Sequence, residues 1–345
     1  MDGKENKTGL PAQFSQRFYY GCIGGIIVVI FLVIPLLKNN YFNHLITEML
    51  LLACLGQAWN IRYGNTGQFS FGHAAFFGIG VYTSGLLYVH LGITPWVGMF
   101  VGGCFALVVG AGIGKVSFRY GLRGVYFAFV TLASAEIFLL LTLLWEPLTG
   151  GGQGILLPWT GHNPLMFSFA VNKKYLYYYI ALAMAICYTL IAYWIKQVRL
   201  GYFLAAIRED EDAAEILGID GPKYKLVAIS ISAFLTALCG TFYLQYYQHV
   251  EPELAFGVVR TFEMIFPVIL GGGGYVLGPP LGAFVLQSLE ETVRAIMPPR
   301  MLGFHRMIYG ALLVIMIMYL PGGLMGLIES GKDRLVLKYK NRTKG

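Results

Sequence analysis

Residues 124–145 have the sequence GVYFAFVTLASAEIFLLLTLLW, and this run of apolar side chains decides the class of fold. It reaches the roughly 20 residues that an α-helix needs to cross the hydrocarbon core of a bilayer. The composition extends this conclusion to the whole chain of 345 residues, because 57% are hydrophobic and 12% are charged. Soluble globular proteins carry about 25% charged residues. The sequence therefore predicts an all-α, polytopic integral membrane protein.

Further apolar segments follow one another on both sides of this run. Together with it, they predict spans at about 18–37, 44–62, 69–91, 96–116, 124–145, 175–197, 224–247, 262–274, 280–297 and 306–322. The segments at 262–274 and 280–297 allow two interpretations, one interrupted span or two spans around a glycine tetrad. We expect about 8–10 transmembrane helices, with broken or re-entrant glycine-rich segments where the backbone is buried in protein or lines a cavity.

The basic residues favour ten crossings with both termini on the same side. In that arrangement 18 of the 25 Lys and Arg residues share the side of the termini. Basic residues in short loops favour the cytoplasm, so we expect a cytoplasmic N-terminus at 1–17, a transmembrane domain at 18–328 and a basic cytoplasmic tail at 329–345. The tail suits anionic membrane lipid. We expect no nucleic-acid binding, because no soluble module is present to carry it.

One connection departs from the apolar composition, at residues 201–220, with the sequence GYFLAAIREDEDAAEILGID. Five carboxylates and one arginine lie between positions 208 and 215. We expect a short helix that ends at Gly218 or, more firmly, at Gly221 and Pro222. Its narrow apolar stripe comprises Leu204, Ile207, Ala214 and Leu217. A connector lying on anionic lipid would present Lys and Arg, whereas this polar face is acidic, so we favour a protein partner.

Polar residues inside the apolar segments mark a candidate translocation path. Glu136 lies near the middle of its span, where an ionised carboxylate is costly unless it pairs or faces a polar cavity. It could line the path, or be held by hydroxyls such as those of Thr131 and Ser134 in a structural role. A single histidine near a helix start is more often a structural hydrogen-bonding group than a ligand. The candidate path comprises Gln68, Ser70, His73, Thr131, Glu136, Gly271, Gly272, Gly273 and Gly274.

The motifs of enzymes and nucleotide-binding proteins are missing from the sequence. The glycine tetrad lacks the Lys and Ser/Thr of a P-loop, and GAGIGK at 110–115 has valine at both positions that flank it. The external loop at 146–174 contains no HExxH or GxSxG motif. The five cysteines show no zinc or disulfide spacing and are expected to be small buried hydrophobic residues. We expect no enzymatic activity and no cofactor in this chain, and transport driven from outside it.

Six stretches resemble the membrane permease subunits of branched-chain amino-acid ABC importers, in particular the longer of the two paired permeases. They are YGNTGQFSFGHAAFFGIGVY at 63–82, LRGVYFAFVTLASAEI at 122–137, LTGGGQGI at 148–155, AIREDEDAAEILGIDGPKYKLVAISISAFLTALCG at 206–240, VILGGGGYVLGPPLGAF at 268–284 and YLPGGLMGLI at 319–328. They follow one another in order and are spread over most of the range 45–328. Departures from the family pattern are Tyr275 after the tetrad and Gln153–Gly154 in the external loop.

The resemblance implies that residues 206–218, within a cytoplasmic coupling segment at 201–223, dock on an ATPase. The residues concerned are Arg208, Glu209 and Asp210, followed by Ala213, Ala214, Glu215 and Gly218 at the position of the family's EAA-like loop. The implied partners are a second homologous permease, two cytoplasmic ATPase subunits that hold ATP and Mg, and an extracytoplasmic substrate-binding protein. The implied location is the plasma membrane of a prokaryote.

The substrate that the resemblance implies is leucine, isoleucine or valine, carried inward. Urea, short amides or other small amino acids are the alternative within the same class of importer. A self-sufficient channel or secondary carrier, with Glu136 as its ion or proton site, is the alternative from another class.

Overall fold

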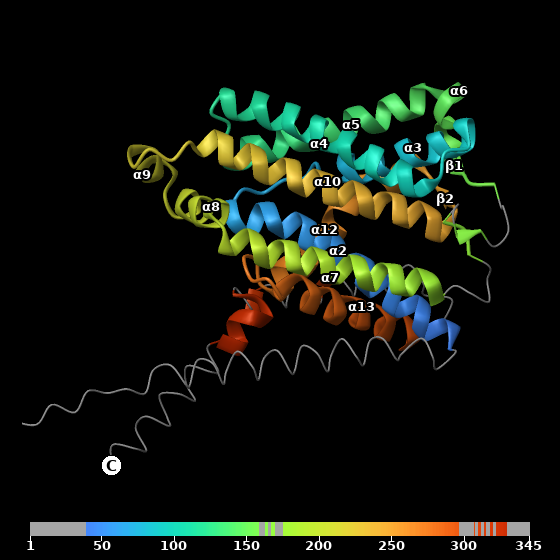
Figure 1. Cartoon of the computed structure of the whole chain (residues 1–345). Coiled ribbons are helices and arrows are strands. Elements are labelled where there is room, and N and C mark those ends of the chain that lie inside the picture. The colour runs from blue at the N-terminus through green and yellow to red at the C-terminus, as the bar shows by residue number, and fades with distance from the viewer. Residues whose placement is uncertain are drawn as a thin grey trace, which may run out of the picture.

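A computed structural model describes residues 39–158 and 175–296, together with short pieces between 163 and 169 and between 307 and 329. Within these residues the chain is almost wholly helical, and the long helices lie side by side (Figure 1). Two short strands, β1 (Ile155–Leu156) and β2 (His249–Val250), pair antiparallel. The expected N-terminus, the first span at 18–37, most of the last span and the basic tail lie outside the described residues.

Six helical stretches of the described chain are long and apolar enough to cross a membrane. They are α3 (His73–Leu91), α4 (Pro95–Arg119), α5 (Gly124–Leu144), α7 (Tyr175–Gln197), α10 (Gly221–Tyr247) and the stretch Pro252–Gly271, formed by α11 (Pro252–Phe256) and α12 (Val258–Gly271). Two further helices, α2 (Asn40–Thr66) and α13 (Gly278–Ile296), pack against this group. The prediction of an all-α, multi-span membrane protein is confirmed.

The glycine tetrad separates two helices that pack against each other. α12 ends at Gly271 and α13 begins at Gly278, so a short loop reverses the chain between them. Gly272 and Gly274 have φ angles of 110° and 90°, in the left-handed region that residues with a side chain rarely adopt. This hairpin supports the interpretation of 262–274 and 280–297 as two segments over that of one interrupted span.

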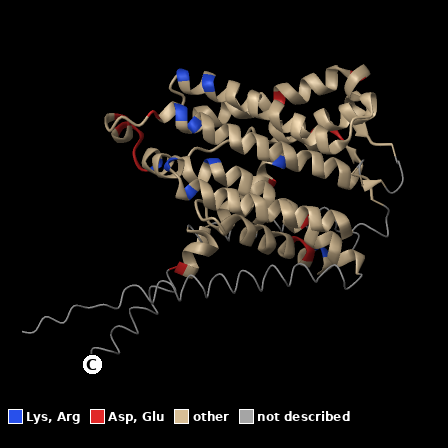
Figure 2. Cartoon of the chain, in the orientation of Figure 1, with Lys and Arg blue, Asp and Glu red and all other residues tan. Residues whose placement is uncertain are grey.

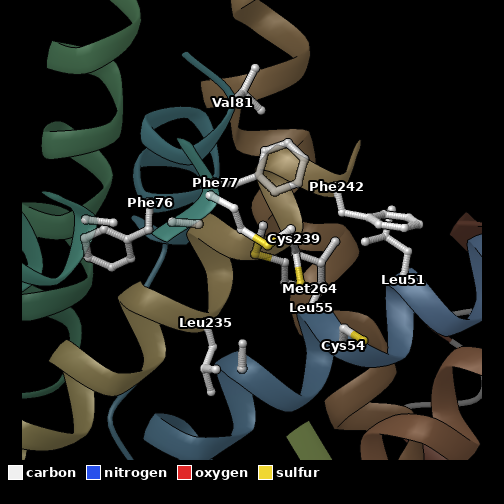
Figure 3. Close-up of a cluster of buried hydrophobic side chains, with 14 of the residues drawn as sticks. Leu51, Cys54, Leu55, Phe76, Phe77, Val81, Leu235, Cys239, Phe242 and Met264 are labelled. Carbon is white, nitrogen blue, oxygen red and sulfur yellow. The ribbon is translucent and has the colours of Figure 1, made fainter. Parts of the chain in front are cut away.

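The apolar core lies where α2, α3, α10 and α12 meet, and Figure 3 shows part of it. Leu55, Phe77, Phe242 and Met264 come from these four helices and are at most 1% exposed. Cys54 and Cys239 are buried in the same region, as expected. The expectation is wrong for two other cysteines, Cys104 and Cys187, which are exposed on the outer faces of α4 and α7. Such faces meet lipid, and lipid accepts a small apolar side chain as readily as a protein core does.

The bundle has two distinct ends, which we name the α9 end and the strand end. The coupling segment, with α8 (Arg199–Glu209) and α9 (Glu211–Ile216), projects at one end (Figure 1). The described part of the loop at 146–174, with α6 (Glu146–Thr149), η2 (Gly151–Gln153) and β1, lies at the other end beside β2. Lys and Arg residues gather toward the α9 end (Figure 2).

Candidate functional site

The coupling segment consists of two helices, so the prediction of one continuous helix is wrong. The break falls at Asp210, whose backbone is extended with φ of −154°. Its carboxylate accepts hydrogen bonds from the backbone N–H groups of Asp212 and Ala213, both at 3.0 Å. Asp210 is therefore the N-cap of α9, because its side chain satisfies amide groups that have no partner in the first turn of a helix.

The break at Asp210 also changes which apolar side chains are buried. Leu204, Ile207 and Ala214 pack with Ala228 of α10 in a small separate core, as the predicted stripe requires. Leu217 does not join them and is 79% exposed, since the two helices do not share one face. Ile216 beside it is 87% exposed. These two residues form an exposed apolar surface, which we call the α9 tip.

Two of the five acidic residues turn toward the chain's own basic side chains. Glu211 lies 2.5 Å from the Nζ atom of Lys225 in α10 and 3.4 Å from the Nε atom of Arg123, which precedes α5. Arg123 also donates to Asp212 at 2.8 Å. This hydrogen bond raises the pKa of the Arg123 guanidinium. Lys225 is only 3% exposed. We call this group the Glu211 cluster; it joins α9 to α5 and α10, so much of the acidic face serves an internal contact.

Arg208 joins the coupling segment to the end of α2, beside the glycine loop between α12 and α13. Its Nη1 atom donates to the carbonyl oxygen of Gly64, at the end of α2, over 2.7 Å. Lys196, at the end of α7, donates to the carbonyl oxygen of Gly274. All four residues line one cavity of about 260 Å³ at the α9 end. The structure thus brings together the glycine tetrad and the coupling segment, which are separate regions of the sequence.

Two side-chain amides of α2 hold the same loop from the other side. Asn60 accepts from the backbone N–H of Gly274 and donates to the carbonyl of Tyr275, both at 3.0 Å. Gln57 donates to the carbonyl of Val276 at 3.0 Å. Gln57, Asn60 and Lys196 were not among the site residues predicted from the sequence. A signal for the two amides was present, because polar residues three positions apart in an apolar span share one helix face.

His73 belongs to a buried hydrogen-bond network at the start of α3. Its Nε2 atom lies 2.7 Å from Ser232 Oγ, and its Nδ1 atom lies 3.1 Å from Ser70 Oγ. Ser232 donates its proton to the carbonyl of Ala58, so we assign the Nε2–H tautomer, in which His73 donates to Ser232. His73 and Ser70 are fully buried, which favours a structural role over the lining of an open path.

The remaining candidate path residues lie in different surroundings. Thr131 Oγ1 accepts from the backbone N–H of Phe71 at 3.2 Å, so it joins α5 to the segment that precedes α3. Gln68 is buried, and its Oε1 atom has no hydrogen-bond partner in the described chain. Glu136 is partly exposed and makes no hydrogen bond with Thr131 or Ser134, whose hydroxyls donate to backbone carbonyls of α5.

These observations describe a multi-span membrane protein with a projecting helical segment, and comparison with known proteins agrees. Residues 40–317 match the family described as permease components of branched-chain amino acid transport systems, and the chain belongs to that family. The predicted class, a permease subunit of this kind, is confirmed. Membership implies separate ATPase and binding-protein partners.

Three relatives show how similar the chain is to individual transport permeases. The chain is 28% identical over 331 residues to the high-affinity branched-chain amino acid transport system permease protein LivM of Escherichia coli K12, covering 89% of this chain and 74% of that protein. It is 24% identical over 213 residues to the probable branched-chain amino acid transport permease protein LivM of Methanocaldococcus jannaschii, covering 59% and 61%. The ribose import permease protein RbsC of Haemophilus influenzae is 25% identical over 138 residues, covering 38% and 41%. No solved structure matches the chain.

Proposed function

We propose that this permease carries leucine, isoleucine and valine into a prokaryotic cell, driven by ATP hydrolysis in separate subunits. Family membership and the relatives named for branched-chain amino acids support this substrate class. The ribose import permeases match over 38% and 61% of the chain, against 89% for LivM of Escherichia coli K12. The complex would contain a second permease, two ATPases and an extracytoplasmic binding protein. The α9 end and both termini would then face the cytoplasm.

The α9 tip is the observation that carries the coupling part of this proposal. Ile216 and Leu217 are exposed at the end of a short helix outside the predicted spans. Exposed Ala213, Glu215 and Gly218 lie beside them. An apolar centre with a polar rim is the usual composition of a protein–protein interface. We assign this surface to ATPase docking, with Glu215 at its rim.

The Glu211 cluster would transmit the ATPase movement to the membrane helices. Glu211 contacts both Lys225 and Arg123, so a displacement of α9 acts on α10 and on the start of α5 together. Arg208 gives a second connection, through Gly64, to the end of α2 beside the glycine loop. The energy comes from the different affinities of the two permease conformations for the nucleotide states of the ATPase. Movement of α5 would displace Thr131 and Glu136, the two candidate path residues that it carries.

Reconstitution of the importer in proteoliposomes tests this function. Labelled leucine should accumulate only when ATP, the ATPase subunits and the binding protein are all present. Uptake by the permease without an ATPase would instead support a secondary carrier, in which the partly exposed Glu136 is the ion site. Accumulation of ribose or urea in place of leucine would overturn the proposed substrate class.

A further inference from the structure

Side chains of α2, α10, α12 and α13 line a cavity of about 280 Å³. This volume is close to the lower limit of the roughly 300–1,000 Å³ typical of small-molecule sites. The start of α2 and the end of α13, which contribute Glu48 and Arg294, lie toward the strand end (Figure 1). The charged side chains that line the cavity are Glu48, Arg260, Glu263, Glu290 and Arg294. They lie far from the Glu211 cluster and have no part in the coupling described above.

The charges of this cavity leave one carboxylate without a strong cationic partner. Arg260 pairs with Glu263 at 2.5 Å, and Arg294 pairs with Glu290 at 3.4 Å and with Glu291, which does not line the cavity, at 2.8 Å. Glu48 has no lysine or arginine partner in the described chain. It lies 3.5 Å from His44 and accepts hydrogen bonds from Tyr247 and Gln287. These contacts orient the Glu48 carboxylate and leave its negative charge available to an ammonium group.

Arg260 supplies a fixed positive group in the same cavity. Its guanidinium carbon lies 4.5 Å from the ring centre of Tyr243 and 4.9 Å from that of Phe77. Its Nε atom donates to the carbonyl of Leu254 at 3.0 Å, and Nη1 donates to Glu263. Tyr243 is a further hydrogen-bond partner, and the guanidinium carries five N–H groups, so a ligand carboxylate would share Arg260 with Glu263. A guanidinium held in this way suits a carboxylate ligand.

Beside the polar groups of His44 and Gln287, several branched and aromatic apolar side chains also line the cavity. They are Leu51, Leu52 and Leu55 of α2, Phe266 of α12 and Leu286 of α13. A ligand with a short branched hydrocarbon side chain would bury that group against them, gaining about 25 cal/mol for each Å² of apolar surface removed from water.

We infer that this cavity binds a free α-amino acid with a branched apolar side chain. Glu48 receives the ammonium group, Arg260 receives the carboxylate, and the leucine cluster of α2 contacts the side chain. The inference deepens the proposed function and rests on it for the substrate class. It adds a substrate site within a single permease chain, at the end opposite the coupling segment.

Equilibrium dialysis of labelled L-leucine against the full chain in lipid nanodiscs tests the inference, with neither binding protein nor ATP present. Two competitors carry one charge each: 3-methylbutylamine has the ammonium group, and 4-methylpentanoate has the carboxylate. If both charges are recognised, each competitor should bind at least about tenfold more weakly than leucine, a difference of about 1.4 kcal/mol. Absence of leucine binding, or equal binding of leucine and either competitor, would overturn the inference.

Variants locate the binding in this cavity. Glu48→Gln should weaken leucine and 3-methylbutylamine by about tenfold or more and leave 4-methylpentanoate unchanged. The matched control is Glu291→Gln, on α13. Glu291 pairs with Arg294 at 2.8 Å, as Glu290 does at a longer distance, but it does not line the cavity. Equal losses in Glu48→Gln and Glu291→Gln would contradict the assignment, and the wild-type competition decides the matter if Glu48→Gln does not fold.

The proposed function has a separate readout. ATP-driven leucine uptake without direct binding to the permease would refute the cavity site alone. Leucine binding without ATP-driven uptake would leave the site standing and refute the importer proposal.

Discussion

The two ends of this bundle use charged side chains in opposite ways. At the α9 end, Glu211 lies between Lys225 and Arg123 and joins three elements, while the surface offered outward is the apolar pair Ile216 and Leu217. Toward the strand end, charged groups surround a hollow instead. An apolar tip suits a protein surface, whereas a charged hollow of limited size suits a small polar molecule. One chain therefore presents two kinds of recognition surface, an apolar tip and a charged cavity.

The largest effect is expected from reversing the charge at the centre of the Glu211 cluster. Glu211→Lys leaves Lys225 buried beside another cation, and breaking a buried ion pair costs about 3–5 kcal/mol. ATP-driven uptake should fall below detection, and the thermal unfolding temperature should drop. The double variant Glu211→Lys, Lys225→Glu restores opposite charges and should recover part of both. Unchanged uptake in the single variant would show that the Glu211 cluster does not transmit the ATPase movement to α5 and α10.

A charge on the α9 tip should abolish docking with little loss of stability. Leu217 is 79% exposed, so Leu217→Asp should change the free energy of unfolding by less than about 0.5 kcal/mol. Uptake and ATPase stimulation by the permease should fall at least about tenfold, because a buried interface charge costs more than the 1.4 kcal/mol that this factor represents. The control is Leu91→Asp, at an exposed leucine that ends α3, away from the tip. Equal uptake in the two variants would show that the α9 tip is not part of the docking surface.

Removing Asn60, one of the two amides that hold the glycine loop, should give an effect of intermediate size. Asn60→Ala leaves the Gly274 N–H and the Tyr275 carbonyl without this partner, at about 1–3 kcal/mol for a buried group. Asn65→Ala is a matched comparison, since Asn65 donates only to the carbonyl of Ile61 in its own helix. Asn60→Ala should lower the thermal unfolding temperature more than Asn65→Ala does. A larger decrease in Asn65→Ala would argue against an anchored loop.

The smallest effect is expected from the cap of α9. Asp210→Ala removes the N-cap and should cost about 1 kcal/mol, while Asp210→Asn keeps an acceptor and should cost less. Amide hydrogen exchange should become faster in residues 211–216 of the alanine variant and remain slow in α10. Equal exchange in both variants would mean that Lys225 and Arg123, and not the cap, hold α9 in place.

Some features of the coupling segment were within reach of the sequence. An aspartate followed by two acidic residues and two alanines is a helix start, because the side chain caps the first turn and the acidic charges favour its positive end. We predicted one helix because Leu204, Ile207, Ala214 and Leu217 fit a single period. The local cap at Asp210 outweighed that period, so Leu217 became exposed.

The contacts that define the two ends could not be predicted from the local sequence. Arg208 and Gly64 are 144 positions apart, and Glu48 meets Tyr247 across 199 positions. No local rule pairs residues at these separations, since their distance depends on how the helices pack. For the same reason the sequence could not tell that Ser70 and His73 would be buried, or that Glu136 would make no hydrogen bond with its neighbouring hydroxyls.

The class of this protein follows from its sequence alone: long apolar runs must form helices in a bilayer, where each backbone group needs a partner within its own segment. Its ordered motifs also determined the family. Helix packing had to be known to see that α9 is tied to α5 and α10, that Asn60 and Lys196 hold the glycine loop, and that a charged cavity lies toward the strand end. The physical reason is that spans follow from local hydrogen bonding, whereas sites follow from side chains that meet only when the helices have packed.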